Sequence, residues 1–111
     1  MNRVARIALA GLLVTALVGT PALAAAGRLS IPRARERAEA FAESTCAHDK
    51  SCFDSGVMEC RRQGDRVVLC RIYDHRRTEK QGDFRCTRLV RLGLQPRTHR
   101  VPVTGVGGWD C

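Results

Sequence analysis

The chain has 111 residues and a formal net charge of +8 at pH 7, because 19 Lys and Arg residues outnumber 11 Asp and Glu residues. A chain of this length is expected to form one small domain whose hydrophobic core is marginal, so covalent staples are expected. Nearly all of the positive charge is arginine. It favours attraction to wall polymers, acidic polysaccharides, nucleic acid or anionic lipids, or else serves solubility.

Residues 1–24 have the layout of a secretory signal peptide. Arg3 and Arg6 precede an uncharged apolar run, helix breakers follow it, and a small-residue cleavage motif ends at Ala24. A retained membrane anchor is the alternative, because the apolar stretch is just long enough to span a bilayer. We expect cleavage after Ala24, a single disulfide-rich domain at residues 25–111, and a secreted, extracellular protein without a membrane span.

The first predicted element of the domain is an amphipathic helix from Ser30 to Thr45. Ser30 can cap its N-terminus, Pro32 is tolerated in its first turn, and Arg35 can pair with Glu39 one turn later. Small and apolar residues recur with helical spacing at Ile31, Ala34, Ala38, Phe41, Ala42 and Cys46. A lone helix of this length is marginal in water, so it must pack on another element.

The predicted partner of the helix is an antiparallel sheet. β-rich segments separated by turn signals occupy residues 56–62, 66–74, 84–92 and 99–103. Pro102 has no N–H to donate, which places the last segment at an edge. The sequence therefore predicts an α+β fold in which one N-terminal helix packs on a three- to four-stranded antiparallel β-meander.

Alternation along the strands assigns their side chains to two faces. The face toward the helix is expected to contain Met58, Cys60, Val68, Cys70, Ile72, Phe84, Cys86 and Val90, with Arg88 as an exception. The opposite face is expected to contain Glu59, Arg61, Arg71, Tyr73, Arg85 and Arg91, mixed with Val57, Val67, Leu69 and Leu89.

The arginines of the opposite face are the strongest functional feature of the sequence. Guanidinium groups bind phosphate and carboxylate, often bidentately. We predict a polyanion-binding surface made of Arg61, Arg71, Tyr73, Arg85 and Arg91. Sheets that bind nucleic acid usually present several aromatic rings, so a single tyrosine argues for a wall or surface polymer instead. The alternative is a solvated face whose arginine stems cover apolar neighbours.

All six cysteines lie in the predicted mature domain, and an even count in a short exported chain indicates three disulfides. A turn around Asp65 places Cys60 opposite Cys70 and Glu59 opposite Arg71. The favoured pairs are Cys46–Cys52, Cys60–Cys70 and Cys86–Cys111, and a helix-to-sheet bridge, Cys46–Cys60, is the rival. Trp109 in the glycine-rich tail either packs on the core or stacks on a ligand.

Three other chemistries receive less support. Zinc ligation by Cys46, His48, Asp49 and Cys52, with Cys60 as a further ligand, matches no standard spacing, so neither a metal nor a cofactor is expected. A small ribonuclease would use Glu59 as base, His75 or His99 as acid, and Arg71 and Arg85 as a phosphate clamp. A protease inhibitor would present the polar stretch 75–83 as an exposed loop.

The order "TC…C…C-R-R…RVVLCR…FRCTRLVRL…C" resembles small, uncharacterised exported proteins of high-GC actinobacteria. The resemblance implies a signal peptide, one arginine- and alanine-rich helix, and a strand meander pinned by cysteines. It carries no catalytic residues to this chain. Together with the arginine face, it predicts a monomeric, secreted, non-enzymatic binding or structural module at the cell surface.

Overall fold

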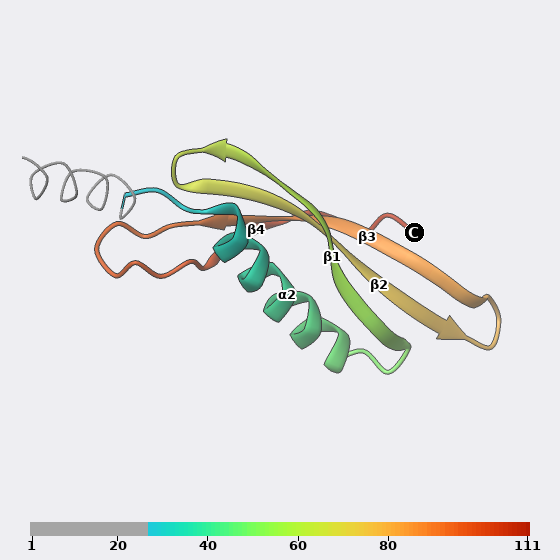
Figure 1. Cartoon of the computed structure of the whole chain (residues 1–111). Helices are drawn as coiled ribbons and strands as arrows, with labels where there is room; N and C mark the ends of the chain where they lie inside the picture. Colours follow the sequence, from blue (N-terminus) through green and yellow to red (C-terminus); the bar gives the residue numbers. More distant parts are fainter. Residues whose placement is uncertain (1–26) are drawn as a thin grey trace, which may run out of the picture.

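The computed structural model describes residues 27–111, so the predicted signal peptide at residues 1–24 lies outside the described part of the chain. Helix α2 (Ile31–Ala47) packs on one face of an open, four-stranded antiparallel sheet (Figure 1). The strands are β1 (Cys52–Gly64), β2 (Val67–Thr78), β3 (Gly82–Gly93) and β4 (Val103–Val106), in the order β1-β2-β3-β4. The predicted α+β architecture is confirmed.

Helix α2 begins where the sequence predicts and ends two residues later, at Ala47. The Ser30 side chain caps it by accepting a hydrogen bond from the Arg33 N–H at 3.3 Å. The helix buries Ala34, Ala38 and Ala42 completely. These small side chains let the helix lie close to the sheet, where the larger side chains of the strands fill the core.

Arginines of α2 fasten the helix to both sides of the sheet. Arg35 donates to the Val57 carbonyl of β1 at 3.0 Å, and Arg37 donates to the Val101 carbonyl before β4 at 3.3 Å. Arg33 donates to the carbonyl of His99 in the same segment. One helix therefore contacts both ends of the strand order.

The core lies between α2 and the sheet face that we call the inner face. Strands β2 and β3 contribute alternate, fully buried side chains, as the period of a strand requires. These side chains are Val68, Cys70, Ile72, Cys86, Val90 and Leu92. Leu29, Leu94 and Val101 close the core from the connecting segments.

The prediction that Met58 faces the core and Val57 faces away from it is wrong. The β1–β2 register pairs Val57 with Ile72 and Glu59 with Arg71, which leaves Met58 as the extra residue of a β-bulge. Val57 is 8% exposed and Met58 is 37% exposed. The bulge shifts the alternation by one residue on the side of β1 that precedes Glu59. Cys60 lies after the bulge and faces Cys70 as predicted.

The predicted loop at 75–83 is mostly strand. β2 and β3 pair continuously until Thr78 meets Gly82, which leaves a short turn at residues 79–81. Gly82 has a φ of +66°, which glycine adopts without strain. Arg77 donates to both carboxylate oxygens of Asp83, at 2.6 and 3.2 Å, and joins the two strands beside the turn. This stretch is therefore the end of a β-hairpin with an exposed turn.

The fourth strand also lies later than predicted, at Val103–Val106 instead of 99–103. The Pro102 carbonyl accepts from the Gly93 N–H at 3.2 Å, but β pairing with β3 begins only after it. Farther along the tail, Thr87 and Asp110 exchange two backbone hydrogen bonds of 2.8 and 2.7 Å. The glycine-rich tail is therefore an extension of the sheet.

Three disulfides hold this fold together: Cys46–Cys52, Cys60–Cys70 and Cys86–Cys111. They are the pairs that the sequence favours, and the rival Cys46–Cys60 bridge is not formed. The first closes the loop after α2, the second joins β1 to β2, and the third ties the tail to β3. Covalent links of this kind typically stabilise a small domain by about 2–4 kcal/mol each.

Candidate functional site

The outer face of the sheet, opposite α2, carries the predicted polyanion-binding residues in rows set by the strand register. One row contains Arg61, Leu69 and Arg91, and the next contains Glu59, Arg71 and Leu89. Farther along lie a row of Gly56, Tyr73 and Thr87 and a row of Asp54, His75 and Arg85. The five predicted residues therefore share one face but fall into different rows.

Three of the five residues form a compact cluster, which we call the basic half: Arg61, Arg71 and Arg91. Arg61 and Arg91 flank Leu69 on strands that lie two spacings apart, about 10 Å. Arg71 pairs with Glu59 at 3.1 Å. The three guanidinium charges and the Glu59 carboxylate together give this cluster a charge of +2. Arg61, Arg71 and Glu59 line a hollow of about 250 Å³ together with Leu69 and Leu89, and Arg91 lies outside this hollow.

Arg85 belongs to a different cluster. Its cross-strand partner is His75, which lies six residues along β2 from Leu69, or roughly 20 Å. Tyr73 lies between the two clusters. The structure therefore does not gather all five predicted residues at one point, and a ligand that contacts Arg91 and Arg85 together must be an extended chain.

The part of the outer face around Arg85 contains three neighbouring rings, which we call the aromatic row: Phe53, His75 and Tyr73. The ring centroid of His75 is 5.1 Å from that of Tyr73 and 6.0 Å from that of Phe53. Phe53 is 52% exposed. Phe53 and His75 are not among the predicted site residues, because the first lies before the predicted strand and the second lies in the predicted loop. The two-residue step from Tyr73 to His75 is the sequence signal for their shared face.

Charged groups of both signs lie around the aromatic row. His75 Nδ1 lies 3.2 Å from Asp54 Oδ2, and Arg77 binds Asp83. The hydrogen bond from Arg77 lowers the pKa of the Asp83 carboxyl below its ordinary value. Arg85 lies in the same row, and Glu39 and Glu43 of α2 add negative charge to a groove that Phe53 and Tyr73 also line. A hollow of about 330 Å³ opens here between Phe53, His75, Asp83, Phe84 and Arg85.

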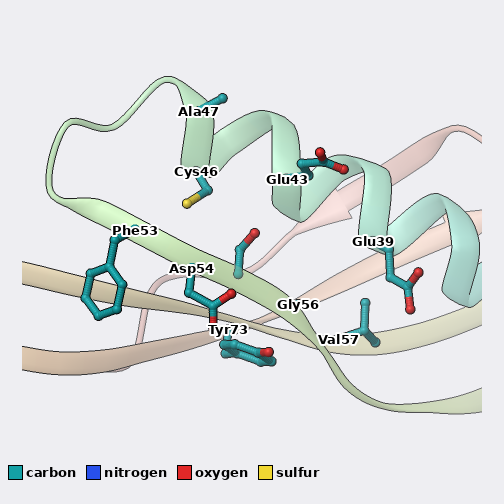
Figure 2. Close-up of a pocket in the computed structure, with 10 residues that line it drawn as sticks. Glu39, Glu43, Cys46, Ala47, Phe53, Asp54, Gly56, Val57 and Tyr73 are labelled. Carbon is teal, nitrogen blue, oxygen red and sulfur yellow. The ribbon is translucent and has the colours of Figure 1, made fainter.

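Tyr73 is positioned by a glycine on the neighbouring strand. A Cβ atom built on Gly56 would lie 2.6 Å from the Tyr73 hydroxyl oxygen, so only glycine lets the ring cross β1 at this point. Figure 2 shows Tyr73 and Phe53 on the side of β1 away from the helix. A groove of about 650 Å³ lies between β1 and α2, and Phe53 and Tyr73 also line it. The same figure shows Glu39 and Glu43, which the helix contributes to this groove.

On the inner face, beyond the hydrophobic core, lies an ionic cluster that the sequence does not predict. Asp74 is 1% exposed and its Oδ2 accepts from Arg76 Nη2 at 3.0 Å. Arg88 stacks on the Trp109 ring, with its guanidinium carbon 4.0 Å from the ring centroid. Burial lowers the pKa of Arg88, against the opposing effect of Asp74. Trp109 thus packs against the core and its flanking arginines.

The residues considered for a nuclease are only partly brought together. Glu59 meets Arg71 on the outer face, but His75 lies four residues farther along β2, roughly 13 Å away. His99 lies in the segment before β4, beside Arg33 of α2, and Arg85 lies in the row of His75. General acid–base catalysis needs acid and base on one substrate group, and this arrangement separates them.

The sulfur atoms considered as zinc ligands are all used in disulfides. Within residues 27–111, no group of three or more His, Cys, Asp or Glu side chains is arranged to hold a metal ion. The same part of the chain contains no helix with the length and hydropathy that a membrane span requires.

Comparisons of the chain with protein-family models, with curated proteins and with solved structures give no match. The functional argument therefore depends on the geometry and charge of the site alone.

Proposed function

We propose that this protein is a secreted, non-enzymatic binding module that contacts anionic cell-surface polymers through the basic half of its outer face. The observation that carries the proposal is the clustering of Arg61, Arg71 and Arg91 around Leu69, with a net charge of +2, next to a hollow that Arg61 and Arg71 line. Closely spaced guanidinium groups bind successive phosphate or carboxylate groups of a polymer.

The hydrogen bonds of the arginines support this choice of surface. Within residues 27–111, Arg37 of α2 and Arg62 and Arg76 of the inner face donate to protein acceptors, whereas Arg61 and Arg91 have no hydrogen-bond acceptor on the protein. Arg71 forms one ion pair, with the exposed carboxylate of Glu59. These three guanidinium groups can therefore contact an anion without breaking a contact that holds the fold.

Three disulfides in so small a domain support an oxidising, extracellular location. A binding module outside the cell encounters wall and surface polymers that carry phosphate or carboxylate groups along an extended chain. Such a ligand matches an open sheet face better than it matches an enclosed pocket.

The test compares two charge-matched triple variants of the secreted protein. In the first, Arg61, Arg71 and Arg91 are changed to Ser; in the second, the exposed Arg28, Arg97 and Arg100 are changed to Ser. We expect the first variant to bind immobilised polygalacturonate or inorganic polyphosphate about ten- to hundredfold more weakly, whereas the second stays close to the wild type. Equal losses in both variants, or no salt-sensitive binding by the wild-type protein, would refute the proposal.

A further inference from the structure

The aromatic row of the outer face has an open side that no part of residues 27–111 covers. Phe53 is 52% exposed, and its ring, the His75 ring and the Tyr73 ring follow one another across the sheet. Arg77 lies over the Phe53 ring, 4.7 Å from its centroid, and holds it at the surface. Flat apolar rings in such a row present a stacking surface to a ligand.

Polar groups of both signs surround these rings. Asp54 and Asp83 supply acceptors beside the rings, and Arg77 and Arg85 supply donors. Of these four residues, Asp83 and Arg85 line the hollow of about 330 Å³. The apolar face of a sugar ring stacks on an aromatic side chain, while its hydroxyl groups both donate and accept hydrogen bonds. The mixture of donors and acceptors around the aromatic row matches that chemistry.

A nucleic acid fits the same surface less well. Proteins that bind single strands surround their stacking rings with positive charge, because every stacked base carries a phosphate with it. Here Asp54 and Asp83 lie beside the rings and would repel those phosphates. A sugar ring of an anionic polysaccharide carries its carboxylate on one carbon and hydroxyl groups on others, so these hydroxyl groups can donate to Asp54 and Asp83 while the carboxylate lies toward Arg77 or Arg85.

The aromatic row also continues directly from the basic half. Tyr73 lies two residues along β2 from Arg71, or about 7 Å, and on the same face. A chain lying along β2 would therefore meet the guanidinium groups of the basic half first and the rings next. A ligand that contacts both regions must therefore carry both charged groups and rings that can stack.

We infer that the outer face binds an anionic polysaccharide, with the basic half contacting its carboxylate or sulfate groups and the aromatic row stacking on its sugar rings. This inference rests on the proposed function and adds the chemical class of the ligand. It distinguishes a polysaccharide from a linear polyphosphate, which has charge but no rings.

The test uses Phe53→Ala and the control Val106→Ala, another exposed apolar residue, 46% exposed, whose partner Val90 places it on the inner side. Both variants are titrated with polygalacturonate, inorganic polyphosphate and oligo-dT. We expect Phe53→Ala to weaken polygalacturonate binding about fivefold and to leave polyphosphate binding unchanged, whereas Val106→Ala changes neither. Ring-proton NMR shifts of Phe53 and Tyr73 on adding polygalacturonate give a second readout.

The outcomes separate the two proposals. If both anions bind through the basic half and Phe53→Ala affects neither, the inference fails and the proposed function stands. If Phe53→Ala weakens oligo-dT more than polygalacturonate, the ligand is a nucleic acid and the inference fails in that way. If the wild-type protein retains no anionic polymer, both fail.

Discussion

The arginines on the two faces of the sheet serve different purposes. On the inner side, Arg62 donates to three backbone carbonyls and Arg76 pairs with the buried Asp74. On the outer face, Arg61 and Arg91 have no hydrogen-bond acceptor within residues 27–111. The difference teaches that a high positive charge does not by itself define a binding surface. Some of the arginines form hydrogen bonds to backbone carbonyl groups or an ion pair with a buried carboxylate, and these contacts stabilise the fold.

The largest contrast is expected between two carboxylates that pair with arginine on opposite faces. Asp74→Ala would leave Arg76 and the half-buried Arg88 without their shared carboxylate, and we expect a loss of about 3 kcal/mol in the free energy of unfolding. Glu59→Ala removes the exposed partner of Arg71 and should cost less than about 1 kcal/mol. Urea denaturation of both variants measures the difference.

Asp74→Asn provides a control that keeps the shape of the side chain and removes its charge. It should be nearly as destabilising as Asp74→Ala, because either change removes the buried carboxylate and leaves Arg76 with only the more distant Asp49, at 3.8 Å. If the Asp74 variants were as stable as Glu59→Ala, the inner cluster would contribute no more than a surface ion pair, and the contrast between the faces would not hold.

A smaller contrast is expected between two arginines that are adjacent in the sequence. Arg62 donates to the carbonyls of Leu29, Gly64 and Asp65 at 2.5 to 3.2 Å, so Arg62→Ser leaves these acceptors without their charged donor. We expect a loss of about 2 kcal/mol, or a fall in Tm of about 10 °C. Arg61→Ser should leave Tm unchanged and weaken binding to polygalacturonate instead.

Circular dichroism during heating and a binding titration measure the two quantities on the same samples. Arg62→Ser should bind polygalacturonate like the wild-type protein wherever it is folded. A variant of Arg62 that binds weakly while keeping its Tm would place this arginine in the binding surface and would contradict the division between the faces.

Much of the fold follows from signals that lie close together in the sequence. The turn around Asp65 fixes the β1–β2 register, so the pairs Cys60–Cys70 and Glu59–Arg71 follow from counting along the two strands. Alternation then assigns the faces of β2 and β3, because neither strand contains a bulge. The sequence predicts which residues form the polyanion surface. It does not predict that Arg85 lies apart from the basic half, because that separation depends on distances along the strands.

The errors come from effects that alternation and composition do not contain. The bulge at Met58 inserts one residue into β1, and nothing in the local pattern marks it. The polar stretch 75–83 has the composition of a loop, but cross-strand pairs such as Arg77–Asp83 make it a hairpin. Asp74 occupies a position of β2 where alternation predicts an apolar side chain. Its neighbour Arg88 comes from another strand, so the burial of Asp74 could not be predicted from the sequence of β2 alone.

The smallest expected effect concerns acid. The pKa values of the Asp83 and Asp49 carboxyls both lie below the ordinary value of 3.8, Asp83 because of its hydrogen bond from Arg77 and Asp49 because of its hydrogen bonds from Ser51. A folded-state pKa below the unfolded one means that the unfolded chain binds the proton more tightly. Each carboxylate therefore stabilises the fold above about pH 4, and this contribution is lost as the pH falls below that value.

Asp83→Asn and Asp49→Asn should each lower Tm slightly at pH 6 and should match the wild type near pH 2, where the carboxyls are protonated.

The two variants should differ in their response to salt. Asp83 forms an exposed ion pair with Arg77. The stabilisation by this pair at pH 6 should become smaller in 0.5 M NaCl, because the screening length of exposed charges is then below about 10 Å. Asp49 depends first on the Ser51 hydroxyl, 2.7 Å from its carboxylate, and a neutral donor is screened much less. Equal salt responses would show that Asp49 depends mainly on Arg76, whose Nη2 lies 3.8 Å from it, and that the ionic cluster of the inner face extends into the loop after α2.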